Sequence, residues 1–463
     1  MRIGKRGFRA QIKGDLRVEF GEEKLTSYAG LELVRRFLRR LNFFRALREA
    51  EKRSAAGGDF SLGKTVLAVV AMLLVGAKRL HHIGFLQGDP MFLRFVGLSR
   101  APTERTLGRA LRRISFRTWP ELDRLALLVA RDAVERAAAK RWTIDIDGSV
   151  IATGQRVERA QHGYNPGHRK NPSYYPILAT LAQTNHVIGH KNRSGNVHDS
   201  HESEVFLRQT VQCARSELGL KGVLEVRADS AFFKPKFLKM MSHLGVEYSI
   251  KVGMWPWLNL RGIIKKIADR NWAWVDRKAG LQGVFAELPI PQWGRAERIA
   301  IFRKRVERRP VKAWQLDLFH PDDGYWEYSV VATNKSLGLR ALWLFHAGHS
   351  VQEKVIGELK AGHAFAAVPT LTYRSNTAWQ KLNVLAHNIA TSFQIATSAE
   401  RRRPTPKRTQ SFRLQSIATL RFEWLVRAAR FLRPGGCPVL RLSNNSATRN
   451  TYQLLQRTLA DAA

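Results

Sequence analysis

The order of short apolar runs over residues 141–252 constrains the fold of this chain more than any other feature. The segment WTIDIDGSV alternates isoleucines with Asp145 and Asp147, which is the two-residue period of a strand. Further runs follow in the order YPILATLAQ, HVIGHKNRSG, a helical stretch over 201–218, VLEVRADSAFF, the short helix PKFLKMMSHLG and VEYSIKV. Three strands, a helix, a strand, a helix and a strand predict a mixed α/β sheet.

The residues before this pattern, 1–135, predict a mostly helical region. In GLELVRRFLRRLNFFRALREA, apolar residues recur every three or four positions and arginine fills much of the other face. The apolar stretch TVLAVVAMLLVGA is too short to span a membrane, so we interpret it as a buried core helix.

A basic helix is predicted within this region. Thr103 precedes an amphipathic run that carries Arg105 and Arg109, which is the pattern of a capped helix start. Such a helix can lie along a phosphate backbone. A solvated face that packs on the rest of the protein explains the charge pattern equally well, so both interpretations stay open.

The strand pattern occupies residues 136–252, and three regions follow it. Residues 253–335 hold seven of the twelve tryptophans and many short β-like runs, and we interpret them as a β-rich insertion. Residues 336–398 return to helical periodicity. Residues 399–463 begin with the basic segment RRRPTPKRTQSFR and contain one more apparent helix, LRFEWLVRAARFL.

The charge balance points to a polyanionic partner. The 77 Lys and Arg residues outnumber 38 Asp and Glu and give a net charge of +39, which repels itself unless a partner neutralises part of it. Nucleic acid is the commonest such partner. Because the sequence has neither a run of about 20 apolar residues nor a visible secretory signal, we expect a cytoplasmic protein without a membrane partner. Cys213 and Cys437 indicate neither a disulfide framework nor a zinc cluster.

Three acid-bearing segments stand out in this basic chain: TIDIDGS, VRADSAFF and SVQEKVIGELK. Mg²⁺ and Mn²⁺ prefer hard oxygen ligands, and two such ions about 4 Å apart can hold the attacking and leaving oxygens of a phosphoryl transfer. Asp147 lies in the first strand and Asp229 at the end of the fourth, so the predicted element order makes them neighbours. Asp145 and Asp147 share one face of their strand, and geometry alone does not separate them.

These segments resemble the DDE transposases of bacterial insertion sequences. The resemblance rests on DGS at Asp147, GYNPGHRKNPSYYP, GNVHDS, RADSAFF around Asp229 and the helix with Glu353. It implies an α/β fold with a ribonuclease H-like mixed sheet, flanking helices, a β-rich insertion before the glutamate and a helical N-terminal domain. It also implies that Asp147, Asp229 and Glu353 hold two Mg²⁺ or Mn²⁺ ions. Cleavage and strand transfer of double-stranded DNA by a nucleoid-associated homodimer follow from the same resemblance.

The group has a signature of Tyr, two residues, Arg, three residues, Glu, six residues and Lys. With Glu353 as the acid, Lys360 matches the final position, whereas His346 and His349 occupy the Tyr and Arg positions. On one continuous helix the four side chains share a face, and the resemblance implies that the two histidines and the lysine contact DNA. Gly348 favours a break in the helix instead.

Structural roles compete with these assignments. Ser350 and Glu353 fit a capping box, and Asp229 suits the cap of a turn. Arg169 lies in a Gly- and Pro-bearing loop that either touches the DNA backbone or forms a plain turn. Weaker candidates, each with a structural alternative, are Tyr164, Asn165, His198, Asp199, Glu358, Asn376, Asn383, Asn388 and the tryptophans of the insertion, which either stack on bases or form core.

Two other functions explain part of the pattern. A DNA-binding relative that no longer cuts and represses its own element fits the histidines at the signature positions. Metal-dependent nicking separates it from an active transposase. A general RNA-binding protein explains the net charge but not the ordered acids.

Overall fold

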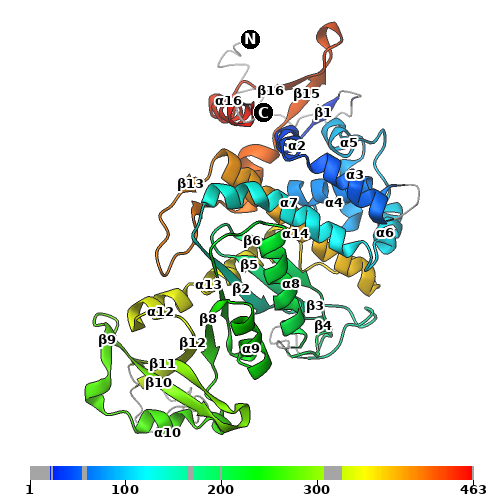
Figure 1. The fold of residues 1–463 in the computed structure, drawn as a ribbon. Coiled ribbons are helices and arrows are strands. Elements are labelled where there is room, and N and C mark those ends of the chain that lie inside the picture. Colours follow the sequence, from blue (N-terminus) through cyan, green and yellow to red (C-terminus); the bar gives the residue numbers. More distant parts are fainter. Residues whose placement is uncertain are drawn as a thin grey trace, which may run out of the picture.

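One large mixed sheet flanked by helices forms the centre of the molecule (Figure 1). The structure is a computed structural model and describes residues 21, 24–54, 60–163, 170–198, 201–306 and 326–460. The strands of the large sheet follow in the order β6-β5-β2-β7-β8-β12-β11-β10-β9.

The first five strands in this order, β6, β5, β2, β7 and β8, are the strands predicted over residues 141–252. β5 runs antiparallel to β2 and β6, whereas β7 runs parallel to β2 and β8. The short strands β3 and β4 form a separate pair between β2 and β5 in sequence. The predicted mixed α/β fold and its element order are therefore confirmed. The bounds are β2 (Arg141–Gly148), β3 (Ile151–Ala152), β4 (Ser173–Tyr174), β5 (Ile177–Leu181), β6 (His186–Lys191), α8 (Ser203–Ser216), β7 (Val223–Ala228), α9 (Pro235–His243) and β8 (Glu247–Val252).

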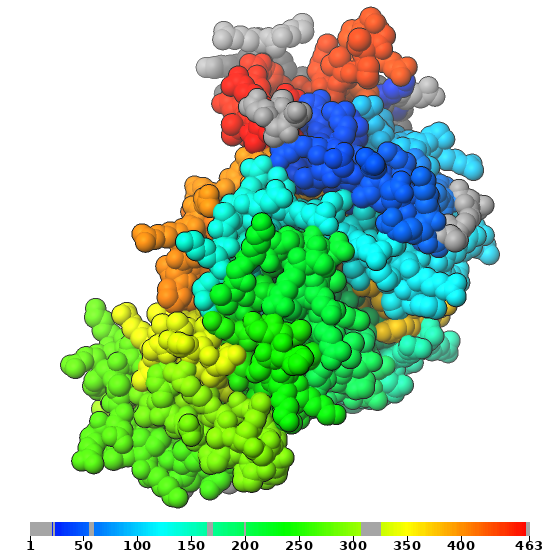
Figure 2. All heavy atoms as spheres, in the orientation of Figure 1, coloured from blue at the N-terminus to red at the C-terminus, as the bar shows by residue number. Residues whose placement is uncertain are grey.

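The region after β8 is rich in β-structure, as predicted, and it continues the same sheet. β12 pairs antiparallel with β8, with Val330 opposite Val252, and β11, β10 and β9 follow outward. In the space-filling view this part projects as a lobe at the lower left (Figure 2). Its elements are α10 (Leu260–Lys265), β9 (Ala273–Asp276), β10 (Leu281–Ile290), β11 (Arg295–Arg305) and β12 (Trp326–Thr333).

The chain then returns to helix in α12 (Leu339–Ala347), α13 (Ser350–Gly362) and α14 (Tyr373–Thr397). α14 is buried along almost its whole length, between the sheet and the amino-terminal helices. Its Asn388 side chain accepts a hydrogen bond from Val187 N (3.0 Å) and donates one to Val187 O (2.9 Å). Asn388 thereby satisfies backbone groups on the outer side of β6, an edge strand.

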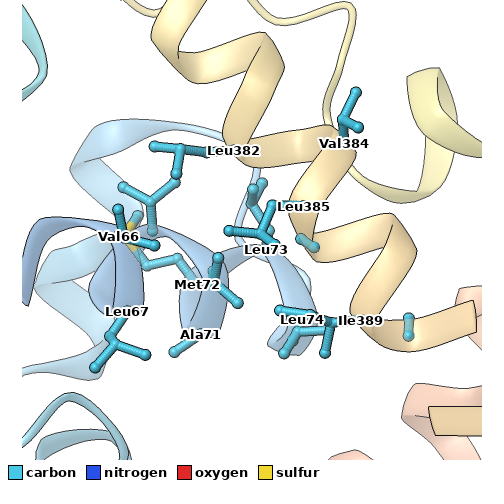
Figure 3. Packing of buried hydrophobic residues seen from close by; sticks show 14 of the residues in the cluster. Val66, Leu67, Ala71, Met72, Leu73, Leu74, Leu382, Val384, Leu385 and Ile389 are labelled. Carbon is cyan, nitrogen blue, oxygen red and sulfur yellow. The ribbon is translucent and has the colours of Figure 1, made fainter. Parts of the chain in front are cut away.

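The amino-terminal region is helical, as predicted, and its apolar helix α4 is a core helix. Leu73 and Leu74 of α4 lie against Leu385 and Ile389 of α14 (Figure 3). Among the described helices, none alone is long and apolar enough to cross a membrane; α4 with the 3₁₀ helix η1 (Leu80–Leu86), bent by 82°, reaches that length and composition. The α-helices here are α2 (Leu31–Arg40), α3 (Phe43–Ser54), α4 (Leu62–Val75), α5 (Pro90–Val96), α6 (Glu104–Arg113) and α7 (Trp119–Ala137).

The carboxyl-terminal residues pack on the amino-terminal helices. Tyr452, Leu455 and Leu459 share one hydrophobic cluster with α2, and the red segments at the top of Figure 2 lie beside the blue ones. The elements are β1 (Leu25–Thr26), β13 (Glu400–Arg401), β14 (Phe412–Arg413), α15 (Ile417–Leu420), β15 (Ala429–Leu432), β16 (Val439–Leu442) and α16 (Ser446–Ala460).

The single helix predicted over LRFEWLVRAARFL is wrong. After α15, residues Arg421–Leu425 form a π-helical turn, and β15 then pairs with β1 on one side and β16 on the other. Tertiary pairing with two distant strands overrides the local helical period.

Candidate active site

Asp147 and Asp229 lie at the carboxyl ends of two neighbouring strands in the interior of the sheet. Their strands β2 and β7 are parallel, and Ile146 is opposite Ala228 in the last pair of the register. Each aspartate comes one residue later, and neighbouring strands lie about 4.8 Å apart. The structure therefore brings together the two acids that the sequence placed on the first and fourth strands.

Each aspartate is half-buried and accepts a backbone hydrogen bond. Asp147 Oδ1 accepts from Gly148 N at 2.7 Å, and Asp229 Oδ1 accepts from Ala231 N at 3.1 Å at the start of the 3₁₀ helix η2 (Ser230–Phe232). The capping role expected as the alternative for Asp229 is thus present. It is compatible with a second role, because a carboxylate has two oxygens and several lone pairs.

Asp145 has different surroundings from Asp147, although both lie on one face of β2. Asp145 is fully buried, and its two oxygens accept from Arg227 Nε and Nη2 at 2.6 and 2.7 Å. Burial acts to raise the pKa of Asp145, but Arg227 and His349 outweigh it, so that the pKa is lowered and the group is a carboxylate. Asp145 therefore forms a buried ion pair with Arg227, whereas Asp147, at the carboxyl end of the strand, is partly exposed to solvent.

Helix α13 packs at the carboxyl end of β2 and carries Glu353. Gln352 Nε2 donates to Leu178 O at 3.2 Å, and Leu178 is the β5 partner of Asp147. Lys360 Nζ donates to Val150 O at 2.9 Å, just beyond β2. Glu353 is exposed on the same helix. It shares a face with Lys360, since residues seven apart lie two turns along a helix.

The capping box that competed for Glu353 is not formed. α13 starts at Ser350, the cap position is His349, and no side chain caps the helix. The predicted break near Gly348 is confirmed, because α12 ends at Ala347 and α13 begins at Ser350. Between the two helices, backbone N–H groups donate hydrogen bonds to the carbonyl three residues earlier, as His349 N does to His346 O.

The two signature histidines face the interior. His346 Nδ1 lies 3.0 Å from Ser249 Oγ of β8, and burial, with nearby His349 and Arg227, lowers its pKa to about 3. His346 is therefore neutral and directed at the sheet. His349 Nδ1 lies 3.1 Å from Asp145 Oδ1. Burial lowers its pKa, but Asp145 and Asp147 outweigh burial, so the pKa of His349 is raised.

Lys360 belongs to the same neighbourhood. Burial lowers the pKa of its ammonium group, and the charge of Asp147 acts in the opposite direction. Asp147 is therefore close enough to interact with Lys360 as well as with His349. This places Lys360 of α13 beside the end of β2.

The donor set fits a hard divalent cation in part. Carboxylate oxygens suit Mg²⁺ and Mn²⁺, and Mg²⁺ is commonly bound through one or two carboxylates while it keeps several waters. Within the described ranges, no group of three or more His, Cys, Asp or Glu side chains is positioned to hold an ion. Asp147 and Asp229 thus form a pair, and Glu353 is not gathered with them into one coordination shell.

The other predicted residues lie elsewhere. Arg105 and Arg109 are exposed on α6. Thr103 caps the start of this helix, as predicted: its Oγ1 accepts a hydrogen bond from Thr106 N at 3.2 Å. The structural alternative holds for Asn388, which bonds the edge strand, and for Asn376, which bonds Thr370 and Tyr174. Outside the described residues lie Tyr164, Asn165, Arg169, Asp199 and Trp314.

A family comparison matches almost the whole chain. The model of the family "Transposase DDE domain group 1" matches residues 8–463. The chain belongs to this transposase family. The resemblance to DDE transposases is therefore confirmed, and an origin in a bacterial insertion sequence stays a prediction.

Among solved structures, the transposase is similar to the piggyBac transposase in a cryo-EM structure of its synaptic complex with hairpin DNA. The sequence identity is 9%, 92% of this chain and 80% of that chain are covered, and the TM-score is 0.42. No curated protein matches the transposase.

Arg227 had no predicted role, and the tryptophans after β8 were predicted either to stack on bases or to form core. Arg227, two residues before Asp229, is an arginine inside an apolar strand, and that placement is the signal that was available. A row of rings also begins four residues after Asp229: Phe233 stacks on Trp255, and Trp255 stacks on Trp257 with centroids 6.1 Å apart. Trp257 is 49% exposed, so the row reaches from the core to the surface.

Proposed function

We propose that this member of the family is an active transposase that cleaves and joins double-stranded DNA with two Mg²⁺ or Mn²⁺ ions held by Asp147 and Asp229, and that Glu353, which lies outside this pair in the structure, joins them as the third ligand when metal and DNA bind. The observation that carries the proposal is the adjacency of Asp147 and Asp229 at the carboxyl ends of two parallel strands. The net charge of +39 supports DNA as the substrate. The ends of an insertion sequence, bridged by a homodimer, are the substrate that the sequence resemblance implies.

The residues divide the work in a simple way. Divalent ions, when bound, would activate the attacking oxygen and stabilise the leaving oxygen of a phosphodiester. Asp147 and Asp229 present carboxylates at the carboxyl ends of β2 and β7, and Glu353 adds a third from α13 when metal and DNA bind. Lys360, beside Asp147, attracts the phosphate that is to be cut.

A second DNA contact is proposed on α6. Arg105 and Arg109 are solvent-exposed on α6 and can meet backbone phosphates without first breaking a buried contact. We propose them as contacts outside the cleavage site. His346 is not proposed as a phosphate contact, because it is neutral and bonded to Ser249.

The test is cleavage by purified protein of DNA that carries the ends of its own element, with Mg²⁺, Mn²⁺ or EDTA. Nicking and strand joining by the wild type, lost in EDTA and in Asp229→Ala, would support the proposal. If both proteins bind the ends equally and neither cuts, the result supports the alternative of a DNA-binding relative that no longer cuts. If RNA binds better than the ends and no metal-dependent cleavage occurs, the result supports an RNA-binding protein.

A further inference from the structure

A buried ion pair lies one pleat below the two site aspartates. Asp145 and Arg227 are partners in the β2–β7 register, and each precedes a site aspartate by two residues. Because alternate residues of a strand share a face, Asp145 and Arg227 lie on the same side of the sheet as Asp147 and Asp229. Both side chains are fully buried, with 0% of each residue exposed.

Arg227 reaches beyond the sheet to the end of α12. Its Nη1 donates to Phe345 O at 2.8 Å, and its Cζ lies 5.1 Å from the centre of the Phe345 ring. A Cβ atom at Gly348 would stand 2.2 Å from Nη1. Only glycine therefore lets the turn between α12 and α13 close over the guanidinium.

The same carboxylate also holds the start of α13. Asp145 Oδ1 lies 3.1 Å from His349 Nδ1, and His349 is the residue directly before the helix. Glu353 follows four positions later, which is about one turn along the same face. Asp145 thus connects β2, β7 and the helix that carries Glu353.

We infer that Asp145, Arg227 and His349 are positioning residues that hold the start of α13, the helix that carries Glu353 and Lys360, against the carboxyl end of β2. The inference rests on the proposed function. Buried ion pairs contribute little net stability compared with apolar residues, and geometric specificity is a reason to keep one. The bidentate pair fixes the plane of the guanidinium, and the bond to Phe345 O fixes the turn that it supports.

This assignment gives His349 a role other than the DNA contact implied for its signature position. Its Nδ1 is directed at the buried carboxylate of Asp145. Misplacement of a reacting group by about 1 Å lowers rates about 100-fold, so loss of this contact has a measurable effect on cleavage.

The test compares Asp145→Asn with Glu225→Gln, which removes the other buried carboxylate on this face of the two strands, opposite Thr143 in the β2–β7 register. For Asp145→Asn we expect single-turnover cleavage about 100-fold slower than the wild type at saturating DNA and Mn²⁺. Its affinity for the DNA ends in Ca²⁺ should stay within about twofold. In metal-free protein, amide hydrogen exchange over residues 350–356 should become faster. Glu225→Gln should lower the melting temperature and leave the cleavage rate of the folded protein and this exchange unchanged.

His349 provides a second pair in case Asp145→Asn does not fold. Asn carries a side-chain N–H close to the position of His Nδ1, so His349→Asn should retain most cleavage, whereas His349→Phe should lose about as much as Asp145→Asn. Equal rates for His349→Phe and the wild type would overturn the inference. Asp145→Asn and Glu225→Gln proteins with equal cleavage rates and equal amide hydrogen exchange over residues 350–356 would also overturn it. If the wild type cuts DNA and either of these two contradicting results is found, only the positioning role fails. If the wild type does not cut, the proposed function fails and the inference fails with it.

Discussion

Strands β2 and β7 carry carboxylates both in their amino-terminal halves and at their carboxyl ends, and the two groups differ in burial and in their partners. In the amino-terminal halves, Glu225 is buried and bonded to Lys335, Arg141 and Thr143. Burial raises its pKa, but these partners outweigh burial and the pKa is lowered. At the carboxyl ends, Asp147 and Asp229 are partly exposed and accept backbone N–H groups, and Lys360 and His349 lie near Asp147. The buried glutamate joins neighbouring strands, whereas the two partly exposed aspartates are the acids proposed to bind a cation.

Asp229→Asn tests the carboxyl end and should have the largest effect. The amide oxygen can still accept from Ala231 N, so stability should change by less than about 0.5 kcal/mol. Metal-dependent cleavage should fall by about 10³-fold or more, because an anionic ligand is lost. Single-turnover cleavage and thermal melting measure the two quantities. A large drop in melting temperature with cleavage intact would place Asp229 among the structural acids.

Lys335→Met tests the amino-terminal half. Lys335 bridges Glu225 and Glu247, and its removal leaves a buried carboxylate without that partner. The free energy of unfolding should fall by about 3–5 kcal/mol, as measured by urea denaturation. The matched control is Lys191→Met, whose pair with Glu202 is exposed and should cost about 1 kcal/mol or less. Equal losses would remove the distinction between buried and open charge.

His186 extends the comparison to a neutral buried group. Burial, with a contribution from His387, lowers its pKa to about 3. Below about pH 6.5 the unfolded chain binds a proton that the folded chain does not, so stability falls with falling pH by about 1.4 kcal/mol per unit for this group. His186→Gln should flatten the dependence of unfolding free energy on pH between about 5 and 6. The exposed His243→Gln serves as control; an unchanged slope in His186→Gln would contradict the assignment.

The double variant Arg105→Gln/Arg109→Gln should have the smallest effect. These exposed side chains should contribute less than about 0.5 kcal/mol to stability. If both meet phosphates, the slope of log K against log salt should fall by about 1.8 in magnitude. Lys140→Gln/Lys221→Gln, at the amino ends of β2 and β7, removes the same charge and should leave the slope unchanged. Identical slopes for both double variants would exclude α6 from the DNA path.

Local sequence patterns predicted much of the catalytic half. The alternation around Asp147 and the apolar run before Asp229 are properties of single strands, and they were enough to give the element order and to bring the two acids together. The side chains of Asp145 and Asp147 could not be distinguished, because the difference comes from Arg227 on another strand.

Features that depend on distant pairing were not visible. The insertion joins the central sheet because β12 pairs with β8, and β15 is a strand because β1 and β16 flank it. The shared core of α2 and α16 likewise joins opposite ends of the chain. Such contacts are specified by three-dimensional packing rather than by local period, so a single sequence gives little sign of them.

The bond between Asn388 and Val187 has a consequence for synthesis on the ribosome. The two residues are 201 positions apart, which corresponds to about 10–40 s of translation at about 5–20 residues per second. During that interval the nascent chain holds β6 without the helix that covers its outer side. Unpaired strand edges of this kind recruit other chains and aggregate. Production of this transposase should therefore benefit from slow expression and from chaperones that shield nascent chains, and truncation before α14 should yield insoluble protein.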